Sequence, residues 1–109
     1  MNKVILCGRL TADPEIRVGN ETKVARFALA VDRRKGEADF FNCISFGKTA
    51  DFAEQWLKKG TKVNLVGRLQ NDTYTNKDGV KVTTTKVVAE EMEFAESKKD
   101  NTDKDPFMF

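Results

Sequence analysis

The sequence predicts an all-β domain, a small Greek-key barrel of five strands with one α-helix between the third and fourth strands. Apolar and polar residues alternate along most of the chain, as they do in half-buried strands. Helical spacing is confined to residues 48–59. Two strand-like runs, VILCGRL at 4–10 and VNLVGRL at 63–69, each contain a glycine. A glycine inside a strand marks a bend, a bulge or a close backbone approach, which suits a strongly curved barrel.

The first strand is expected at residues 4–10, and turns follow at 13–15 and 19–20, where Asp-Pro-Glu and Gly-Asn stand. Residues 22–33 predict the second strand, because apolar residues alternate there with polar or small ones. One face of that strand carries Ala25, Phe27, Leu29 and Val31, and the other carries Arg26 and Asp32.

Residues 34–37, RKGE, predict a hairpin turn, and the third strand is expected at 38–46. This strand contains two adjacent phenylalanines, Phe40 and Phe41. Adjacent residues of a strand point to opposite faces, so the two rings cannot both enter one core. One of them is therefore expected to face something other than the core.

Residues 48–59 predict the helix from the spacing of their apolar residues, Ala50, Ala53, Trp56 and Leu57. Gly60 is expected to end it, with Lys58 and Lys59 in the last turn facing the negative end of the helix dipole. The spacing places Trp56 in the core or between helix and barrel. Its fluorescence is therefore expected to change little when a ligand binds.

The fourth strand is expected to run from residue 63 toward Tyr74, and Asn-Lys-Asp-Gly at 76–79 predicts a hairpin turn. Residues 80–89, rich in β-branched side chains, predict the last long strand. Three strands, one helix and two strands are the order of the OB-fold. We expect this domain over residues 1–96 and a polar, disordered tail over 97–109.

The chain has 109 residues, enough for one small domain, with 33% charged and 39% apolar residues. No run approaches the roughly 18 apolar residues of a membrane span. The N-terminal MNKVILCGRL is charged too early for a signal peptide and enters a strand pattern at once. We therefore expect a cytoplasmic protein of bacterial or phage origin, without a membrane partner.

The two cysteines, Cys7 and Cys43, stand in apolar strand-like runs and are expected to be buried, reduced thiols. The chain contains no histidine, so neither a zinc site nor a Ser-His or Cys-His pair can be assembled. The seven glycines are scattered singly, and none of them forms a phosphate-binding loop. We expect no metal, no cofactor and no catalytic residues.

The net charge of +2 is unevenly distributed. Residues 1–89 carry ten acidic and sixteen basic side chains, whereas residues 90–109 carry seven acidic and three basic ones. A basic body followed by an acidic tail suggests a polyanionic partner for the body.

Four segments, taken together, resemble one known family: NKVILCGRLTADPEIR, VARFALAV, ADFFNCISFGKTADFAEQWLKKGTKVNLVGRL and DGVKVTTTKVVAEEMEF. They span nearly all of residues 2–94 and are similar to the bacterial single-stranded DNA-binding proteins. The short members from Gram-positive bacteria and their phages are the most similar. The resemblance implies an OB-fold, usually a homotetramer, that wraps single-stranded DNA in replication, recombination and repair, and therefore a location at the nucleoid.

The resemblance also assigns the ring that faces outward. It implies that Phe40 and Phe46 are aromatic residues of the DNA side. Alternation then puts the polar Asn42 on the same face and the small Cys43 inside. The alternative is that Phe40 and Phe46 belong to the core. Tyr74 matches a third DNA-side aromatic residue, with a ring that covers the barrel mouth as the alternative.

Basic residues are expected to contact phosphates. The resemblance implies this role for Arg17, Lys48 and Lys59. Charge alone adds seven candidates: Arg9, Arg26, Arg33, Arg34, Lys35, Lys62 and Arg68. The alternative is that these side chains form an ordinary solvated face.

Self-association and partner docking are expected from the resemblance. It implies a homotetramer, with a homodimer as the smaller alternative, and the edge strand at Lys3–Cys7 as a contact between copies. A tail whose tip contains Pro106, Phe107 and Phe109 is expected to dock replication and repair enzymes. The alternative is a tail that is only a solvated end.

Two other functions fit the same residues. The first is another nucleic-acid module on this fold, such as a replication-restart accessory protein or an RNA binder. The second is an OB-fold adaptor that binds proteins or sugars, which would not bind oligonucleotides in a salt-dependent way.

Overall fold

The computed structural model describes residues 1–96, and the tail expected over 97–109 lies outside the described residues. In chain order the elements are β1 (Val4–Leu10), β2 (Glu15–Gly19), β3 (Thr22–Arg34), β4 (Glu37–Phe46), α1 (Lys48–Trp56), β5 (Lys62–Thr75) and β6 (Lys81–Phe94). No helix in this part of the chain is long and apolar enough to span a membrane.

The strands form one sheet in the order β1-β5-β6-β4-β3-β2, and β1 also pairs with β3 at Arg9↔Ala30 and Leu10↔Leu29. This extra pairing closes the sheet into a ring. β4 and β6 run parallel where Ile44 meets Val88, and all the other pairs are antiparallel. The predicted Greek-key barrel of the OB-fold is confirmed, with the helix between the long strands β4 and β5.

One strand, β2, was not expected. Its five residues pair with β3 from Glu15↔Arg26 to Gly19↔Thr22, in a stretch where the sequence predicts only turns on either side. Only Ile16 of this strand is half-buried, and its other side chains are exposed. Its residues do alternate, with Ile16 and Val18 between Glu15 and Arg17, but the strand is only five residues long and lies between two turn signals.

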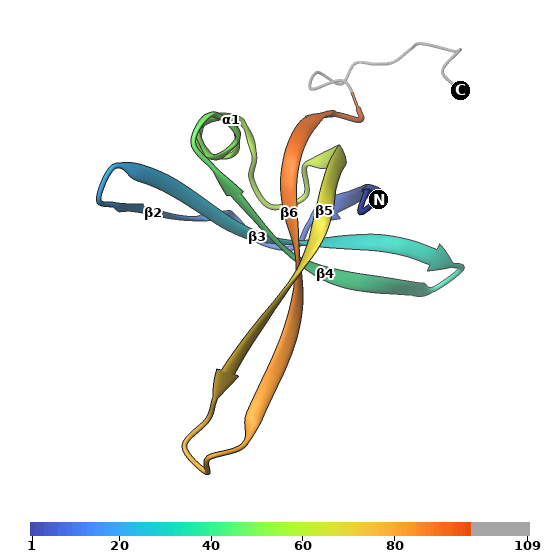
Figure 1. The fold of residues 1–109 in the computed structure, drawn as a ribbon. Coiled ribbons are helices and arrows are strands. Elements are labelled where there is room, and N and C mark those ends of the chain that lie inside the picture. Colours follow the sequence, from blue (N-terminus) through green and yellow to red (C-terminus); the bar gives the residue numbers. More distant parts are fainter. Residues whose placement is uncertain (97–109) are drawn as a thin grey trace.

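Three two-stranded hairpins project from the barrel: β2–β3, β3–β4 and β5–β6 (Figure 1). Both predicted hairpin turns are confirmed, at Lys35-Gly36 and between Thr75 and Lys81. In the second turn the Asn76 side-chain oxygen accepts hydrogen bonds from the backbone N–H groups of Asp78 and Val80, at 2.9 and 3.0 Å. Beyond Gly67, β5 pairs with β6 alone among the described strands.

The helix is shorter than predicted. It ends at Trp56, and Leu57 is already extended, with φ −98° and ψ 142°, because its side chain turns into the core. Gly60 lies in the following turn and does not end the helix, and its N–H donates to the Leu10 carbonyl. Lys58 therefore follows the helix and is not in its last turn, and the same holds for Lys59.

The glycines of the two similar strands allow close backbone contact. A Cβ added at Gly8 would lie 2.5 Å from the Ala30 carbonyl oxygen, and one at Gly67 would lie 2.1 Å from that of Val88. The β5–β6 register also shifts at Gly67, so this glycine marks a bulge. The close backbone approach and the bulge are both features that the sequence predicts for glycines inside strands.

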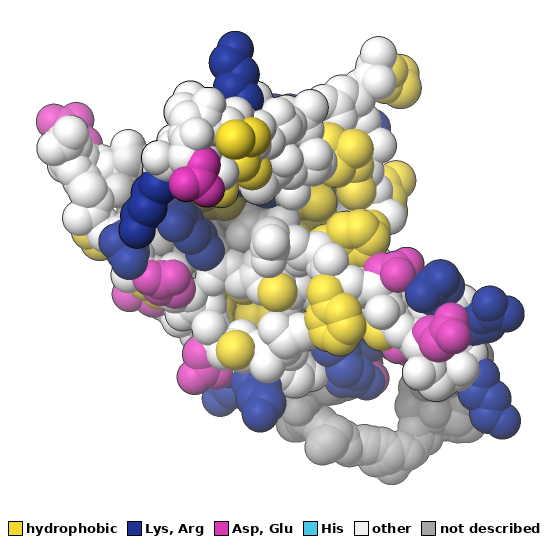
Figure 2. Space-filling view, turned by 90° about the horizontal axis from the view of Figure 1, so that it is seen from below, with side chains coloured by type: hydrophobic (Ala, Val, Ile, Leu, Met, Phe, Trp, Pro, Cys, Tyr) yellow, Lys and Arg dark blue, Asp and Glu magenta, His cyan; other side chains and the backbone are white. Residues whose placement is uncertain are grey.

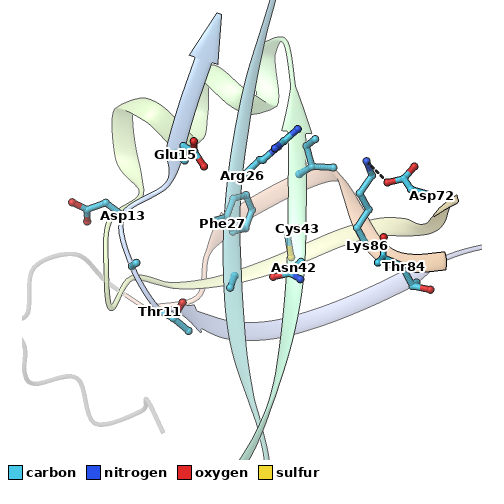
Figure 3. Close-up of a pocket in the computed structure, with 14 residues that line it drawn as sticks. Thr11, Asp13, Glu15, Arg26, Phe27, Asn42, Cys43, Asp72, Thr84 and Lys86 are labelled. Carbon is cyan, nitrogen blue, oxygen red and sulfur yellow. Dashed lines mark ion pairs between the residues drawn. The ribbon is translucent and has the colours of Figure 1, made fainter. Parts of the chain in front are cut away.

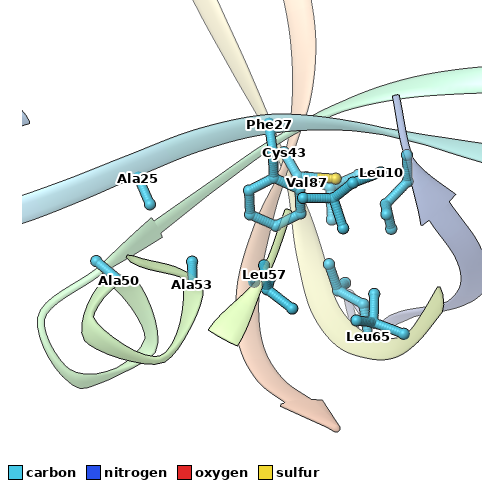
Figure 4. Packing of buried hydrophobic residues seen from close by; sticks show 12 residues of the cluster. Leu10, Ala25, Phe27, Cys43, Ala50, Ala53, Leu57, Leu65 and Val87 are labelled. Atoms are coloured by element: carbon cyan, nitrogen blue, oxygen red, sulfur yellow. The ribbon is translucent and has the colours of Figure 1, made fainter. Parts of the chain in front are cut away.

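The core lies between the barrel strands and the helix (Figure 4). Small Ala50 and Ala53 let the helix approach β3 closely at Ala25. The buried cluster comprises Leu10, Ala25, Phe27, Leu29, Cys43, Ala50, Ala53, Leu57, Val63, Leu65, Val87 and Ala89. At its edge the rings of Phe52 and Phe94 meet with centroids 5.5 Å apart.

The two cysteines differ in environment. Cys43 is buried as predicted, and burial raises the pKa of its thiol to about 12. Cys7 is exposed, so the prediction that both thiols are buried is wrong for this residue. The cause is alternation in β1, where Leu6 and Gly8 face inward and Cys7 faces outward.

Candidate nucleic-acid interface

An open groove of about 590 Å³ crosses the outer face of the barrel between the β2–β3 hairpin and the β5–β6 hairpin (Figure 3). Every strand except β1 contributes to it, together with the β1–β2 connection. We call it the barrel groove, and its lining residues are Thr11, Ala12, Asp13, Glu15, Arg26, Phe27, Ala28, Asn42, Cys43, Ile44, Asp72, Thr84, Thr85 and Lys86.

A row of paired residues crosses this face. Strand register aligns Glu15 with Arg26, Arg26 with Ile44, Ile44 with Val88, and Val88 with Arg68. Ile44 and Val88 are buried but do not belong to the core cluster, because they face outward. They form an apolar strip with an arginine on each side.

The face assignment within β4 follows the predicted alternation. Phe40 is 67% exposed and Phe46 is 44% exposed, whereas Cys43 and Ser45 are buried. Asn42 is exposed on the same face as the two rings and lines the barrel groove. The alternative that both rings belong to the core is therefore excluded, and a role in binding DNA remains a prediction.

Tyr74 belongs to the projecting part of the β5–β6 hairpin and is 53% exposed. Because Asp72 and Tyr74 are two residues apart in one strand, both point to the face of the barrel groove. Tyr74 lies opposite Val82 of β6, in the part of β5 that extends beyond its pairing with β1, so the alternative of a ring that covers the barrel mouth is not favoured.

A second hollow of about 600 Å³ lies beside Phe40 at the β3–β4 hairpin and contains the three predicted cations Arg33, Arg34 and Lys35. Arg33 forms ion pairs with Glu37 and Asp39, at 3.6 and 3.4 Å, and Arg34 pairs with Glu37 at 3.2 Å. Lys35 makes no ion pair with any of residues 1–96. It is the cation of this hairpin that is free to meet a phosphate.

Several other predicted cations are held by carboxylates. Arg17 pairs with Glu15 at 2.8 Å, and Arg68 pairs with Glu90 at 3.0 Å. Arg68 and Lys3 together lower the pKa of Glu90. These arginines share the outer surface with the groove, but a phosphate would have to compete with Glu15 and Glu90 for them.

The ion pair between Lys86 and Asp72 lies inside the barrel groove, at 2.8 Å (Figure 3). Lys86 lowers the pKa of Asp72, so this carboxylate stays charged at neutral pH. Together with Asp13 and Glu15 it gives the groove three acidic side chains against Arg26 and Lys86. The groove itself is therefore not a strongly basic channel.

The remaining predicted lysines do not line the barrel groove. Lys48 begins α1, two residues after Phe46, and is exposed. Lys59 follows the helix, and its backbone N–H donates to Asp13 at 2.8 Å. Lys62 is half-buried at the start of β5. Of these three, only Lys48 adjoins a predicted stacking ring along the chain.

Sequence reasoning missed some of the groove and left the place of one ring open. Lys86 was not singled out, although alternation from the inward Val87 puts it on the outer face. Arg26 was proposed from charge alone, and the structure places it at the centre of the groove. Trp56 is 48% exposed, which excludes the core; it lies beside Lys62 and Phe94 of the barrel, so the other predicted place, between helix and barrel, fits it. The helix ends at Trp56, and its buried face passes through Ala50 and Ala53 instead.

One face of the molecule shows how these groups are distributed. In Figure 2 apolar side chains lie across the middle of the view, and basic and acidic side chains lie around them. A small closed barrel with an open groove, exposed rings and cations on its hairpins defines the class of OB-fold barrels that bind extended polymers on their surface. Among residues 1–96, no three Cys, Asp or Glu residues gather as metal ligands.

Comparison with known proteins makes this class specific. The model of the single-strand binding protein family matches residues 1–95. The single-stranded DNA-binding protein of Clostridium perfringens is 48% identical, over 89% of this chain and 67% of its own length. The Fusobacterium nucleatum protein of that name is 46% identical, over 90% and 69%. A Listeria monocytogenes relative, single-stranded DNA-binding protein 2, is 42% identical, over 94% and 69%. The chain belongs to the single-strand binding protein family.

Proposed function

We propose that this protein binds single-stranded DNA without sequence preference and coats it during replication, recombination and repair. The observation that carries the proposal is the exposure of Phe40, Phe46 and Tyr74, on strands that also contribute residues to the barrel groove. Several large exposed rings on one small domain are typical of an interaction surface. Every base has a π-face, so stacking on such rings does not depend on sequence.

Cations around the rings supply the second part of the affinity. Lys35 lies in the hollow beside Phe40, and Lys48 follows Phe46 by two residues. Arg26 lies between the two rings on the neighbouring strand, opposite Ile44. Phosphates that alternate with stacked bases would meet these three cations in turn. Binding by rings and cations needs no reacting group, so we propose no catalysis.

We also propose that copies of the chain assemble through β1, into a homotetramer. Residues Val4–Gly8 pair with β5 on one side, and the β1–β3 pairing begins only at Arg9. The other edge of this segment therefore offers unpaired backbone groups. Ile5, which is 74% exposed, adds apolar surface there.

The remaining parts of the proposal follow from the family. Residues 1–96 would form the DNA-binding domain, and residues 97–109 a tail that docks replication and repair enzymes at its tip, Pro106 to Phe109. The tail lies outside the described residues. Such a protein would work in the cytoplasm, on the nucleoid.

The test is a titration of labelled oligo-dT with the protein at two salt concentrations, with fluorescence anisotropy as the readout of binding. The logarithm of the affinity should fall against the logarithm of salt with a slope of about −0.7 per phosphate neutralised. An oligo-U competitor of the same length should displace the DNA poorly. Equal competition by RNA would favour an RNA-binding module, and salt-independent or absent binding would favour a protein-binding or sugar-binding adaptor.

A further inference from the structure

Trp56 lies in a third hollow, of about 380 Å³, between the end of α1 and the start of β5. We call it the helix hollow, and its lining residues are Trp56, Lys58, Lys59, Gly60, Thr61, Lys62, Phe94 and Glu96. Trp56 is the only tryptophan of the chain, and almost half of its surface is exposed. A tryptophan ring with this exposure offers a large π-face to a ligand.

The charges around this ring favour an anion. Three lysines line the hollow and only one carboxylate, Glu96, does. That carboxylate is held by Arg9, whose two terminal nitrogens lie 3.1 and 2.7 Å from its oxygens, and Arg9 lowers its pKa. Neither Lys58 nor Lys59 makes an ion pair with any of residues 1–96. The hollow therefore carries positive charge that the described part of the chain does not neutralise.

The helix hollow adjoins the barrel groove through backbone contacts. The Lys59 N–H donates to Asp13, which lines the groove, at 2.8 Å. The Gly60 N–H donates to the Leu10 carbonyl at 2.9 Å, and the Leu10 N–H donates to Thr61 at 3.0 Å. These bonds fix the loop that carries the lysines against the rim of the groove. A chain leaving the groove over Asp13 would reach Lys59 next.

We propose that the helix hollow is a second binding site for the same DNA strand, with a base stacked on Trp56 and phosphates held by Lys58 and Lys59. An aromatic face among cations matches a polymer in which flat bases alternate with phosphates, and both parts of the contact are present here. This inference rests on the proposed function. It adds that the strand continues from the groove across the loop after α1.

Intrinsic fluorescence tests the site directly, because every tryptophan photon from this protein comes from Trp56. The full chain is titrated with oligo-dT of about 5 and about 16 nucleotides, lengths chosen from the range that one OB-fold covers. Anisotropy of a labelled oligonucleotide reports total binding in parallel. We expect both lengths to bind and only the longer one to quench Trp56, in place of the small fluorescence change that the helical spacing predicts. Binding of the longer strand without quenching would overturn the second site and leave the function standing, whereas no binding at all would overturn both.

Variants separate stacking from charge. Trp56→Ala should weaken binding of the long oligonucleotide about tenfold and leave the short one unchanged. Lys58→Gln should make the salt slope of the long oligonucleotide shallower by about 0.7. Lys77→Gln removes the same charge at the exposed β5–β6 turn, outside both hollows, and should not change that slope. Equal effects on short and long strands would overturn the proposal.

The other candidate occupant is the chain's own terminus, since the hollow includes Glu96 and the chain continues beyond it. A protein ending at Glu96 distinguishes the two. If the hollow serves DNA, the truncated protein should show the same quenching of Trp56 by long oligo-dT. If truncation alone makes Trp56 more accessible to acrylamide and oligo-dT leaves its fluorescence unchanged, the hollow holds the terminus and the proposal is overturned.

Discussion

At the scale of single residues, the aromatic side chains fall into two groups with different energetic roles. Phe27 is buried at the centre of the core, where a ring contributes by leaving water and filling space. Phe40, Phe46 and Tyr74 remain exposed, so their removal costs the folded state little buried area. Stability and binding should therefore respond to different rings.

Replacing any one of Phe40, Phe46 or Tyr74 by alanine should weaken binding of oligo-dT by about 1–3 kcal/mol, because one base loses its stacking surface. The free energy of unfolding should change little, since each ring is at least 44% exposed. Anisotropy titrations give the first quantity and urea unfolding the second.

Phe27→Ala is the matched control, because it removes the same ring from the core of β3 and not from the surface. It should lower the unfolding free energy by about 3–5 kcal/mol. A Phe40→Ala protein that unfolds while its remaining folded fraction binds DNA normally would show that the exposed face is not the binding face.

At the scale of elements, the sequence predicted the long strands, the helix and the hairpin turns, and missed one short strand. Strand alternation identified β3 and β4, and hairpin turns were located by Gly36 and Asn76. The strand β2 was missed because its five residues lie between two turn signals, although Ile16 packs against the core. The core and the helix–barrel contact stayed open as places for Trp56, because helical spacing alone does not show that the helix stops there, where Leu57 turns into the core.

The part of the candidate site that could be predicted from the sequence is the part that depends on alternation within one strand. That reasoning separated Phe40 from Cys43. It could not assemble the groove, because the alignment of Arg26 with Ile44 and of Ile44 with Val88 depends on pairing between distant strands. It also could not show which cations are engaged, since the pair of Arg68 with Glu90 is a contact between β5 and β6.

The close approach of β5 and β6 at Gly67 predicts a stability effect. A methyl group at this position would lie 2.1 Å from the backbone oxygen of Val88, so Gly67→Ala must displace a strand. The loss should reach the upper end of the roughly 1–3 kcal/mol typical of overpacking, measured by urea unfolding. Gly19→Ala is the control, because no atom lies within 4 Å of the added carbon, and it should change stability by less than about 0.5 kcal/mol. Equal effects at both positions would contradict the close packing.

The ion pair of Asp72 with Lys86 predicts that an acidic side chain weakens binding. Asp72→Asn should free Lys86 and remove a negative charge from the groove. DNA binding should then tighten, and the salt slope should steepen by about 0.7 if Lys86 takes up a phosphate. The measurement is the affinity for oligo-dT at several salt concentrations.

Glu21→Gln provides the comparison, because it removes one negative charge at the exposed β2–β3 turn, outside the groove. It should tighten binding of oligo-dT by less than Asp72→Asn does, and salt should screen this effect because the charge is exposed. Acidification should act like Asp72→Asn: Lys86 lowers the pKa of Asp72, so the pair persists as pH falls to that lowered value and is lost below it. An affinity that falls in Asp72→Asn would show that Asp72 itself binds the ligand.

At the scale of the whole molecule, assembly through β1 can be followed by its cysteine. Cys7 is exposed in the single chain, whereas Cys43 is buried with a pKa of about 12 and stays protonated near pH 8. If β1 pairs with a second copy, modification of Cys7 by a thiol reagent should slow as protein concentration rises. Cys43 should remain slow at every concentration.

A Cys7→Ser protein shows which modification rate belongs to which cysteine, because it should lose the faster reaction entirely. Light scattering on the same samples gives the assembly size. A Cys7 rate that does not depend on concentration, in a protein that light scattering shows to be a tetramer, would place the contact on another surface.

The one-sided pairing of the projecting β5–β6 segment has a consequence for amide hydrogen exchange. Strand residues 63–66 are held by β1 and β6, whereas residues 70–75 have β6 alone. A two-stranded hairpin is at best marginally stable by itself. The amides of the projecting segment should therefore open and exchange with solvent deuterium far faster than those of the barrel. A bound strand stacked on Tyr74 would slow that exchange, so part of the binding free energy would be spent in ordering the hairpin, and a stiffened hairpin would bind more tightly without any new contact.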